Sequence, residues 1–313
     1  MELRNLGNSG LQLPVVGLGT NNFGGRIDKQ QSAAVVAKAL ELGVNFFDTA
    51  DVYGNRGGSE EALGEALNGH RHEAIIGTKF ASPMGEGPYL NGASRRYIMH
   101  AVDASLRRLG TDYIDLYQVH FPDQRTPIEE TLRTLDDVVR AGKVRYIGCS
   151  NFTGWQIADA SWTARTDRLT PFVSAQNQYS LLERRPEREV LPACKRFGLG
   201  LLPFFPLASG FLTGKYRQGE PLPEGTRLAN AGPMANRVLT EENFGVLGKL
   251  ESFAQQRGKT ILDLAMGWLA SNEQVTSIIA GATRPEQVEQ NVRSSEWRLT
   301  KEEMAEVSAM TRA

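Results

Sequence analysis

The sequence repeats one kind of unit along its length: a short run of β-branched and aromatic residues, followed by an amphipathic, helix-like segment. Most successive runs begin about 30 residues apart, which is the length of one strand–helix unit. Eight such runs begin near Val15, Val44, Ala74, Tyr113, Arg145, Val173, Leu199 and Thr276. Strands that alternate with helices predict an α/β fold built on a parallel sheet.

Eight strand–helix units allow two architectures, an open doubly wound sheet or a closed barrel. The 313 residues contain no obvious linker or break in composition, so we expect residues 1–313 to form a single (β/α)₈ TIM-barrel domain. The first residues, Leu3 to Leu13, centre on Asn8-Ser9-Gly10 and predict a β-hairpin ahead of the first barrel strand.

Helix boundaries and loop lengths agree with this barrel. Ser94 and Gly110 are suited to begin and end one helix, and Pro127 and Gly142 frame another. The interval from Leu199 to Thr276 is 77 residues long, so it must hold a long loop and at least one extra helix. Long loops after barrel strands usually serve the active-site face at the C-terminal ends of the strands.

Composition excludes several classes of protein. The chain is 41% hydrophobic and 23% charged, as in a globular protein, and its formal net charge of −1 provides no field to attract nucleic acid. Two cysteines give no disulfide framework, and the N-terminus lacks the apolar core of a signal peptide. The most apolar stretch, 198–212, contains two prolines and is too short to span a membrane. We expect a cytoplasmic protein that binds neither membrane nor nucleic acid.

Three consecutive predicted strands end in residues that can carry chemistry. The second strand ends at Asp48, the third at Lys79 and the fourth at His120, and Tyr53 follows Asp48 in a glycine-rich loop. Because the C-terminal ends of barrel strands share one rim, the four side chains are expected to meet there.

These four residue types suit proton donation to a carbonyl oxygen. A tyrosine, with a pKa near 10, is a weak acid unless a neighbour stabilises its phenolate. A nearby lysine lowers the tyrosine pKa, and an aspartate keeps that lysine charged and in place. A histidine can orient the carbonyl or assist proton delivery, and the developing alkoxide needs such electrostatic support.

Each residue alone also has an ordinary structural interpretation. Asp48 could begin a helix, Lys79 could be a solvated lysine, and Tyr53 and His120 could be structural. Their conjunction at successive strand ends favours a catalytic group. Other motifs are weaker: the glycines of residues 17–20 lack the spacing of a dinucleotide-binding turn, and no P-loop is present.

Charged and metal-binding motifs add no further site. His70-Arg-His72 is expected to be an exposed loop after a helix, and we expect no metal site. Arg107-Arg108 and Arg184-Arg185 are expected on solvated faces.

Along nearly its whole length the chain resembles the aldo-keto reductases, including bacterial-type members and the potassium-channel β-subunits of that superfamily. The matching runs are Gly17-Leu-Gly-Thr20, Phe47-Asp-Thr-Ala-Asp-Val-Tyr-Gly54 with Ser59-Glu60, Asp112-Tyr-Ile-Asp-Leu-Tyr-Gln-Val-His120, Gly142-Lys-Val-Arg-Tyr-Ile-Gly-Cys-Ser-Asn-Phe152, Gln176-Asn-Gln-Tyr-Ser-Leu-Leu-Glu-Arg184, Pro206-Leu-Ala-Ser-Gly-Phe-Leu-Thr-Gly-Lys215 and Gly281-Ala-Thr-Arg-Pro-Glu-Gln-Val-Glu-Gln-Asn291. The order and spacing of these runs both fit the family.

The resemblance implies that Tyr53 is the general acid and base, aided by Asp48, Lys79 and His120, and that NADPH or NADP⁺ lies across the barrel mouth. It implies nicotinamide contacts from Ser150, Asn151, Gln176 and Phe204, and pyrophosphate contacts from Leu207, Ser209, Gly210, Thr213 and Lys215. At the adenosine end it implies Arg227, Thr283, Arg284, Gln287, Gln290 and Asn291. Gly19, Thr20, Asn21, Asp48, Phe205, Pro206 and Gly281 complete the implied cofactor surface.

Three positions depart from the family pattern. Phe204-Phe205 replaces a frequent Tyr or Trp followed by Ser, which keeps ring stacking and removes a hydroxyl. Gln290 stands where relatives usually have Glu. Phe121 replaces a frequent Trp next to the histidine and is expected to border the substrate.

The resemblance and the four catalytic candidates together indicate an NADPH-dependent reductase of small aldehydes or ketones, with polar, sugar-like or aromatic carbonyls as the substrate class. The alternative is an NADPH-binding, redox-sensing regulatory subunit that turns over slowly, as the channel β-subunits of the superfamily can be. The sequence leaves the oligomeric state open.

Overall fold

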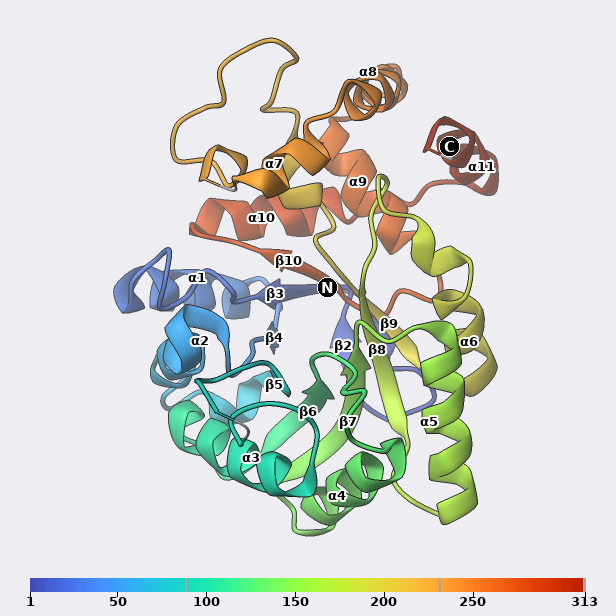
Figure 1. The fold of residues 1–313 in the computed structure, drawn as a ribbon. Helices are drawn as coiled ribbons and strands as arrows, with labels where there is room; N and C mark the ends of the chain where they lie inside the picture. The colour runs from blue at the N-terminus through green and yellow to red at the C-terminus, as the bar shows by residue number, and fades with distance from the viewer. Residues whose placement is uncertain (88, 231, 312–313) are drawn as a thin grey trace.

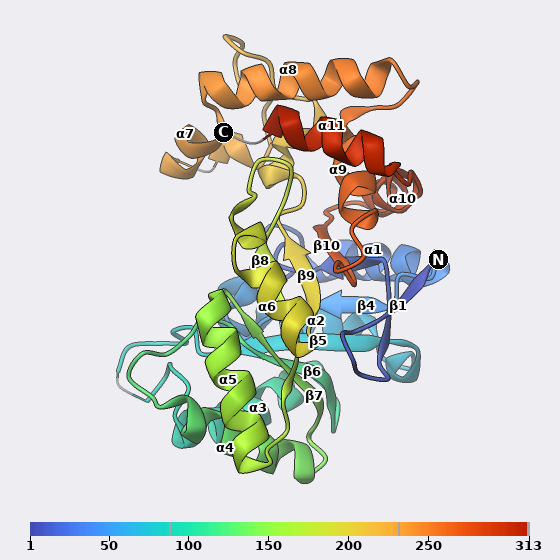
Figure 2. The ribbon, with the colours of Figure 1, turned by 90° about the vertical axis from the view of Figure 1, so that its right-hand side faces the viewer.

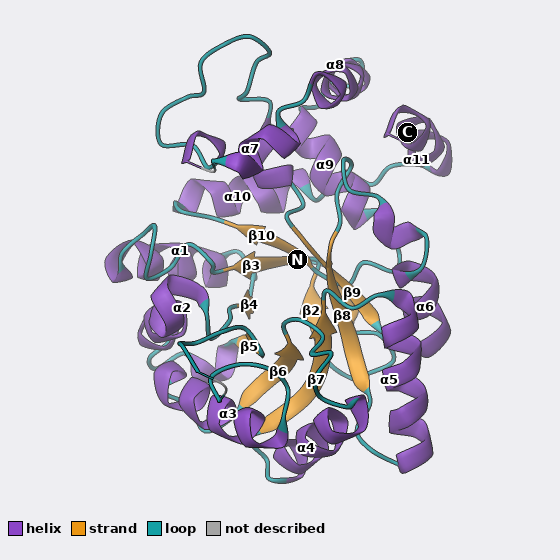
Figure 3. Ribbon diagram, viewed as in Figure 1, coloured by secondary structure: helices purple, strands orange, loops and turns teal. Residues whose placement is uncertain are grey.

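Eight parallel strands close into a barrel in the computed structural model, which describes residues 1–87, 89–230 and 232–311. In barrel order the strands are β3 (Val16–Gly19), β4 (Phe46–Asp48), β5 (Ile75–Phe80), β6 (Ile114–Val119), β7 (Val144–Ser150), β8 (Phe172–Gln178), β9 (Gly200–Phe204) and β10 (Ile278–Gly281). Parallel pairing of β10 with β3 closes the ring, and Figure 3 shows the strands surrounded by helices. The predicted (β/α)₈ fold is confirmed, and each strand begins within two residues of its predicted position.

The helices that cover the barrel are α1 (Lys29–Glu41), α2 (Tyr53–Ala66), α3 (Arg95–Leu109), α4 (Ile128–Arg140), α5 (Gly154–Asp167), α6 (Val190–Phe197), α9 (Ile261–Ala270) and α10 (Pro285–Ser294). The predicted ends of α3 are confirmed: the Ser94 hydroxyl accepts a hydrogen bond from the Tyr97 amide, and Gly110 ends the helix in the left-handed conformation. Helix α4 follows Pro127, as predicted.

The N-terminal hairpin closes one end of the barrel. Strands β1 (Leu3–Asn5) and β2 (Gln12–Pro14) pair antiparallel, which confirms the predicted hairpin, and Figure 2 shows it at the right-hand end of the barrel. Leu6 and Leu13 are fully buried and pack against Phe46, Leu116 and Leu202 inside the barrel. The barrel therefore has an apolar floor, and its polar residues gather at the opposite end.

The long segment between β9 and β10 holds the extra structure that its length requires. It forms 3₁₀ turns at Ala208–Thr213 and Leu228–Asn230, and then helices α7 (Pro233–Val238), α8 (Glu241–Gln255) and α9. Figure 1 shows a wide loop before α7, at the top of the view, and helix α11 (Lys301–Thr311), which packs against α8. Within the ranges that the structure describes, no helix is both long enough and apolar enough to cross a membrane.

The prediction that both arginine pairs lie on solvated faces is wrong for Arg108 and Arg184. The Arg108 Nε donates to Glu60 Oε2 at 2.7 Å, and Glu60 is fully buried. The Arg184 guanidinium lies 4.6 Å from the centre of the Trp268 ring and donates to the Thr311 hydroxyl. A buried carboxylate without a partner would be costly, so the long side chain of Arg108 reaches inward to it.

Candidate active site

A fully buried ion pair lies at the mouth of the barrel. Asp48 ends β4 opposite Gly77 of the neighbouring strand β5, and Lys79 lies two residues further along β5, on the same face as Gly77. The Lys79 Nζ donates to Asp48 Oδ2 at 2.7 Å and to the Thr49 carbonyl oxygen at 2.8 Å. Burial alone would lower the pKa of Lys79, but Asp48 and Tyr53 outweigh this effect and raise it. Lys79 is therefore charged.

Asp48 is held by more residues than the sequence analysis identified. Its Oδ1 accepts hydrogen bonds from Gln176 Nε2 at 2.8 Å and from Gln118 Nε2 at 3.3 Å. Gln118 is fully buried and was not predicted as a site residue. It lies on β6, two residues before His120, which directly follows the strand, and side chains two apart along extended chain share a face. This spacing is the signal that would have identified it.

Tyr53 reaches the ion pair from the start of α2. The next residue, Gly54, has φ 63°, and a Cβ there would lie 2.5 Å from both the Phe23 carbonyl oxygen and the Ser59 amide. Glycine is thus required for the tight turn that directs Tyr53 inward. The Lys79 Nζ lies 5.1 Å from the centre of the Tyr53 ring, and the His120 ring meets Tyr53 edge-on at 5.7 Å. All four predicted catalytic residues therefore lie together.

The expected lowering of the Tyr53 pKa is not the net effect in this structure. Burial is the largest influence and raises the pKa of the Tyr53 hydroxyl, while the positive charge of Lys79 opposes it. The phenol consequently stays protonated at neutral pH and has a proton to give. Stabilisation by Lys79 becomes more important as that proton leaves.

His120 is an uncharged group at the mouth. It is 7% exposed, and burial, followed by the charge of Lys79, lowers the pKa of His120 to about 3. Its Nδ1 lies 3.1 Å from the Ser82 hydroxyl, its carbonyl oxygen accepts from Asn151 Nδ2 at 2.9 Å, and its ring stacks on Phe121 at 4.8 Å. A neutral imidazole can donate or accept a hydrogen bond at its remaining nitrogen.

The residues expected at the nicotinamide adjoin this group. Ser150 and Gln176 lie on the paired strands β7 and β8, and the Ser150 hydroxyl donates to the Gln176 carbonyl oxygen at 2.9 Å. The Asn151 Nδ2 also donates to the Ser150 hydroxyl. Phe204 ends β9, and its ring meets Phe205 edge-on at 5.3 Å. The Gln176 side chain also contacts Asp48, so it links this surface to the ion pair.

The predicted pyrophosphate segment has an unusual backbone. Ala208, Ser209 and Gly210 have positive φ values, and the Thr213 hydroxyl donates to the Gly210 carbonyl oxygen at 2.8 Å. The exposed Lys215 lies against this turn, because a Cβ on Gly210 would be 3.1 Å from the Lys215 Nζ. Pro206 is buried and Leu207 is partly buried just before the turn. An ammonium beside a left-handed turn suits an anion.

The residues expected at the adenosine end lie in two places, one beside Phe205 and the other at and near helix α10. The Arg227 guanidinium lies 4.8 Å from the centre of the Phe205 ring, near Tyr53. Arg284 precedes α10 and is exposed, as are Gly281 and Gln290, while Asn291 is buried. The Thr283 amide donates to Gln287 Oε1 at 2.7 Å, and the Thr283 hydroxyl does so at 3.2 Å. Glu286 is exposed, as expected for a residue that faces solvent.

The candidates at the end of the first strand, Gly19, Thr20 and Asn21, differ in how far they are buried. The Thr20 side chain is fully buried and interacts with the Asp48 carbonyl oxygen and the Ser59 hydroxyl. Thr20 therefore holds the backbone that carries Asp48. Asn21 is partly exposed, and its Oδ1 would lie 3.5 Å from a Cβ on Gly281, so these two positions adjoin.

Metal ligands do not gather among the described residues: no three histidine, cysteine or carboxylate side chains are arranged to hold an ion. His70 is exposed, and its Nδ1 pairs with Glu73 at 2.7 Å.

Comparison with known proteins identifies the family to which the chain belongs. Residues 15–312 match the model of the aldo/keto reductase family. L-glyceraldehyde 3-phosphate reductase of Escherichia coli K12 is 37% identical over 94% of this chain and 87% of its own length. A probable voltage-gated potassium channel subunit beta of Arabidopsis thaliana is 39% identical over 94% and 91%, and versiconal hemiacetal acetate reductase of Aspergillus parasiticus is 34% identical over 97% and 95%. The chain belongs to the aldo/keto reductase family, and the reductases among its relatives support a carbonyl-reducing oxidoreductase of a family that generally uses NAD(P)H.

Proposed function

We propose that this protein is a cytoplasmic, NADPH-dependent reductase that converts aldehydes or ketones to alcohols within a single barrel domain. The observation that carries the proposal is the buried Lys79–Asp48 pair next to the protonated Tyr53. Perturbed titratable groups packed together at a barrel mouth are typical of an active site.

The chain's own residues account for the proton half of the reaction. Tyr53 gives its hydroxyl proton to the carbonyl oxygen, and Lys79 stabilises the phenolate that remains. His120, being neutral, donates a hydrogen bond to the same oxygen as negative charge develops on it. Asp48 keeps Lys79 charged and in place. Bound NADPH would supply the hydride to the carbonyl carbon.

The chemistry of the donor set supports an anionic dinucleotide across the mouth. Among the described residues, no carboxylate forms a salt bridge with Lys215, Arg227 or Arg284. Lys215 beside the Ala208–Thr213 turn would hold the pyrophosphate, and Ser150, Asn151 and Gln176 would hold the nicotinamide amide. Arg284, with the start of α10, would hold the 2′-phosphate. The position of Arg227 over Phe205 favours a phosphate nearer the nicotinamide than the adenosine end.

The substrate would enter beside Phe121. This ring is 49% exposed and stacks on His120, so it presents an apolar face next to the proposed proton donors. The resulting site has one aromatic wall and a polar base, which suits small polar, sugar-like or aromatic carbonyl compounds.

The proposal is tested by measuring NADPH consumption with a panel of aldehydes, ketones and aldoses. We expect steady-state turnover with several aldehydes, at a rate that saturates with substrate. Turnover with none of the panel, in protein that binds NADPH, would contradict the proposal.

The second candidate function is that of an NADPH-binding, redox-sensing regulatory subunit. Its support is the 39% identity to the probable channel β-subunit of Arabidopsis thaliana. This function predicts slow turnover, tight retention of the cofactor and a stable complex with a membrane protein. Measured side by side, turnover numbers and the rate of cofactor release distinguish the two functions.

A further inference from the structure

Ser82 contacts the His120 ring at Nδ1. The Ser82 hydroxyl lies 3.1 Å from His120 Nδ1, and Ser82 is only 5% exposed. Ser82 follows β5, whereas His120 follows β6, so the contact joins two neighbouring strand ends. Ser82 is not one of the four residues, Asp48, Tyr53, Lys79 and His120, to which the proposed function assigns a chemical role.

The backbone before Ser82 is held in an uncommon conformation. Ala81 has φ 88°, which a residue with a Cβ rarely adopts. Its carbonyl oxygen accepts from the Gly92 amide at 3.0 Å, and the Ser82 carbonyl oxygen accepts from the Tyr97 hydroxyl at 3.4 Å. Such strain persists only where surrounding contacts impose it, and it clusters at functional sites. Here the strained turn is followed directly by the side chain that meets His120.

The proton count, taken with the proposed function, favours one direction for this hydrogen bond. His120 is neutral, so one ring nitrogen carries a hydrogen and the other accepts. If Nδ1 carried it, Ser82 would accept, and the serine's own hydrogen would have no acceptor among the described residues. If Ser82 donates to Nδ1, the ring hydrogen lies on Nε2, where the proposed function places the substrate oxygen that accepts it.

We propose that Ser82 is a positioning residue that donates its hydroxyl hydrogen to His120 Nδ1 and thereby keeps His120 in the Nε2–H form. The consequence for catalysis rests on the proposed function, because it requires that Nε2–H meets the carbonyl oxygen. The assigned direction of the hydrogen bond rests on it for the same reason, but the tautomer of His120 can be measured without substrate.

The first test measures the tautomer without substrate. The chain has four histidines, so ¹⁵N-histidine labelling gives a spectrum simple enough to assign with a His120→Gln variant. Protonated and unprotonated ring nitrogens differ clearly in ¹⁵N shift. We expect wild-type His120 to show a protonated Nε2 and an unprotonated Nδ1, and Ser82→Ala to show a mixture of both forms. A wild-type Nδ1–H form, or an unchanged spectrum in Ser82→Ala, would overturn the proposal.

Matched variants separate this role from a merely structural one. Tyr97→Phe removes a hydrogen bond to the same segment but leaves the Ser82 hydroxyl, so it should keep the Nε2–H form. Ser82→Thr keeps the hydroxyl and should restore that form. A mixture of tautomers in Tyr97→Phe would show that general loosening, and not the hydroxyl, controls the ring.

The second test is kinetic. Losing the orientation of one hydrogen-bond donor should lower kcat of Ser82→Ala about tenfold, with KM for NADPH unchanged. Ser82→Thr should recover most of this loss. If the tautomer changes as expected but kcat does not, the positioning stands and the proposed role of His120 at the carbonyl fails.

Discussion

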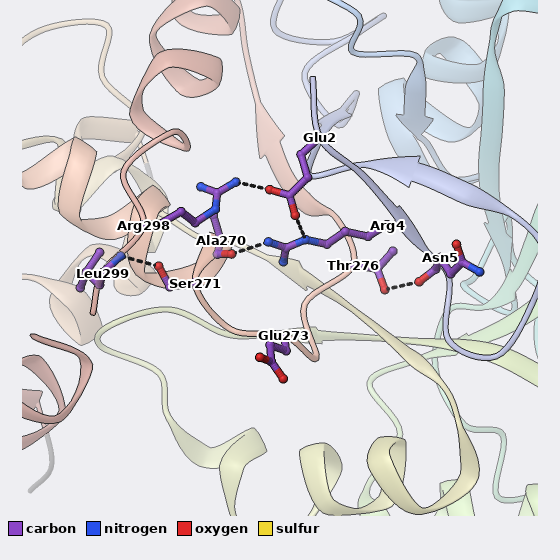
Figure 4. A pocket seen from close by; sticks show the side chains of 9 residues that line it. All are labelled: Glu2, Arg4, Asn5, Ala270, Ser271, Glu273, Thr276, Arg298 and Leu299. Atoms are coloured by element: carbon purple, nitrogen blue, oxygen red, sulfur yellow. Dashed lines mark hydrogen bonds and ion pairs between the residues drawn. The ribbon is translucent and has the colours of Figure 1, made fainter. Parts of the chain in front are cut away.

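The two ends of the barrel hold ion pairs of opposite character. At the mouth, the Lys79 and Asp48 side chains are 0% and 4% exposed. At the floor, Arg298 and Glu2 are 38% and 44% exposed and line a shallow hollow of about 520 Å³ (Figure 4). Exposed pairs form at little cost, whereas a buried pair must overcome the loss of hydration of both charges.

The floor uses its charges to fasten the chain. The Arg4 guanidinium donates to the carbonyl oxygens of Ala270 at 2.6 Å and Val275 at 2.7 Å, and Glu2 joins Arg4 to Arg298 (Figure 4). These bonds tie the N-terminal hairpin to the segment between α9 and β10. At the mouth, Lys79 is directed at Asp48 and Tyr53. Charge at the floor therefore fastens the fold, whereas the buried charge at the mouth carries a cost in lost hydration that the proposed function would explain.

The largest expected effect is that of Tyr53→Phe on reduction. The variant keeps the ring but has no proton to give, so kcat should fall by about 10²–10⁴-fold, while NADPH still binds. Steady-state kinetics with an unreactive ketone measure the loss, and fluorescence titration measures NADPH binding. Arg298→Gln is the control from the floor and should retain full activity. Retention of more than about a tenth of wild-type kcat by Tyr53→Phe would remove Tyr53 from the proton-donor role.

Lys79→Met should be nearly as inactive as Tyr53→Phe, because the phenolate loses its stabilising charge. The double variant should be little worse than either single variant, since residues that act as one unit give non-additive losses. Asp48→Asn should affect rate more than cofactor binding. The measurement is a double-mutant cycle on kcat, with thermal unfolding as the control for folding. Additive losses would mean that the two residues work separately.

The elements that follow from the spacing of hydrophobic residues or from local capping residues could be predicted from the sequence. Strand starts and the ends of α3 follow from hydrophobic spacing and from capping residues, which act locally. Asp48, Lys79 and His120 could be identified because strand ends share a rim. Ser82 could not, because it meets His120 only through the left-handed turn at Ala81, which ordinary residues rarely form. The inward turn of Arg108 was missed for a related reason: its partner, Glu60, lies 48 residues away in the chain.

At the outer rim of the mouth, we expect a charged side chain to set the preference for NADPH over NADH. NADPH should bind at least about tenfold more tightly than NADH, about 1.4 kcal/mol, which is modest for one charge-assisted contact with the 2′-phosphate. Arg284→Ala should shrink this ratio by weakening NADPH. Arg227 lies over Phe205, so Arg227→Ala should weaken both cofactors alike. Fluorescence titrations of both cofactors measure the ratio. Equal wild-type affinities, or a ratio untouched by Arg284→Ala, would remove Arg284 from the phosphate site.

The smallest effects on activity are expected at the floor. There, Arg4 and Arg298 should still differ in how much each contributes to the free energy of unfolding. Arg4 is 17% exposed in its side chain and donates to two partly buried backbone carbonyl oxygens, which would lose this donor, so Arg4→Met should cost about 1–3 kcal/mol of unfolding free energy. Arg298 is more exposed and pairs with the exposed Glu2, so Arg298→Met should cost about 0–1 kcal/mol. Urea unfolding measures both values, and kcat should stay within about twofold of wild type because neither side chain approaches Tyr53. A large loss of kcat in Arg298→Met, with unchanged stability, would mean that the floor shares in function and that the contrast between the two ends is wrong.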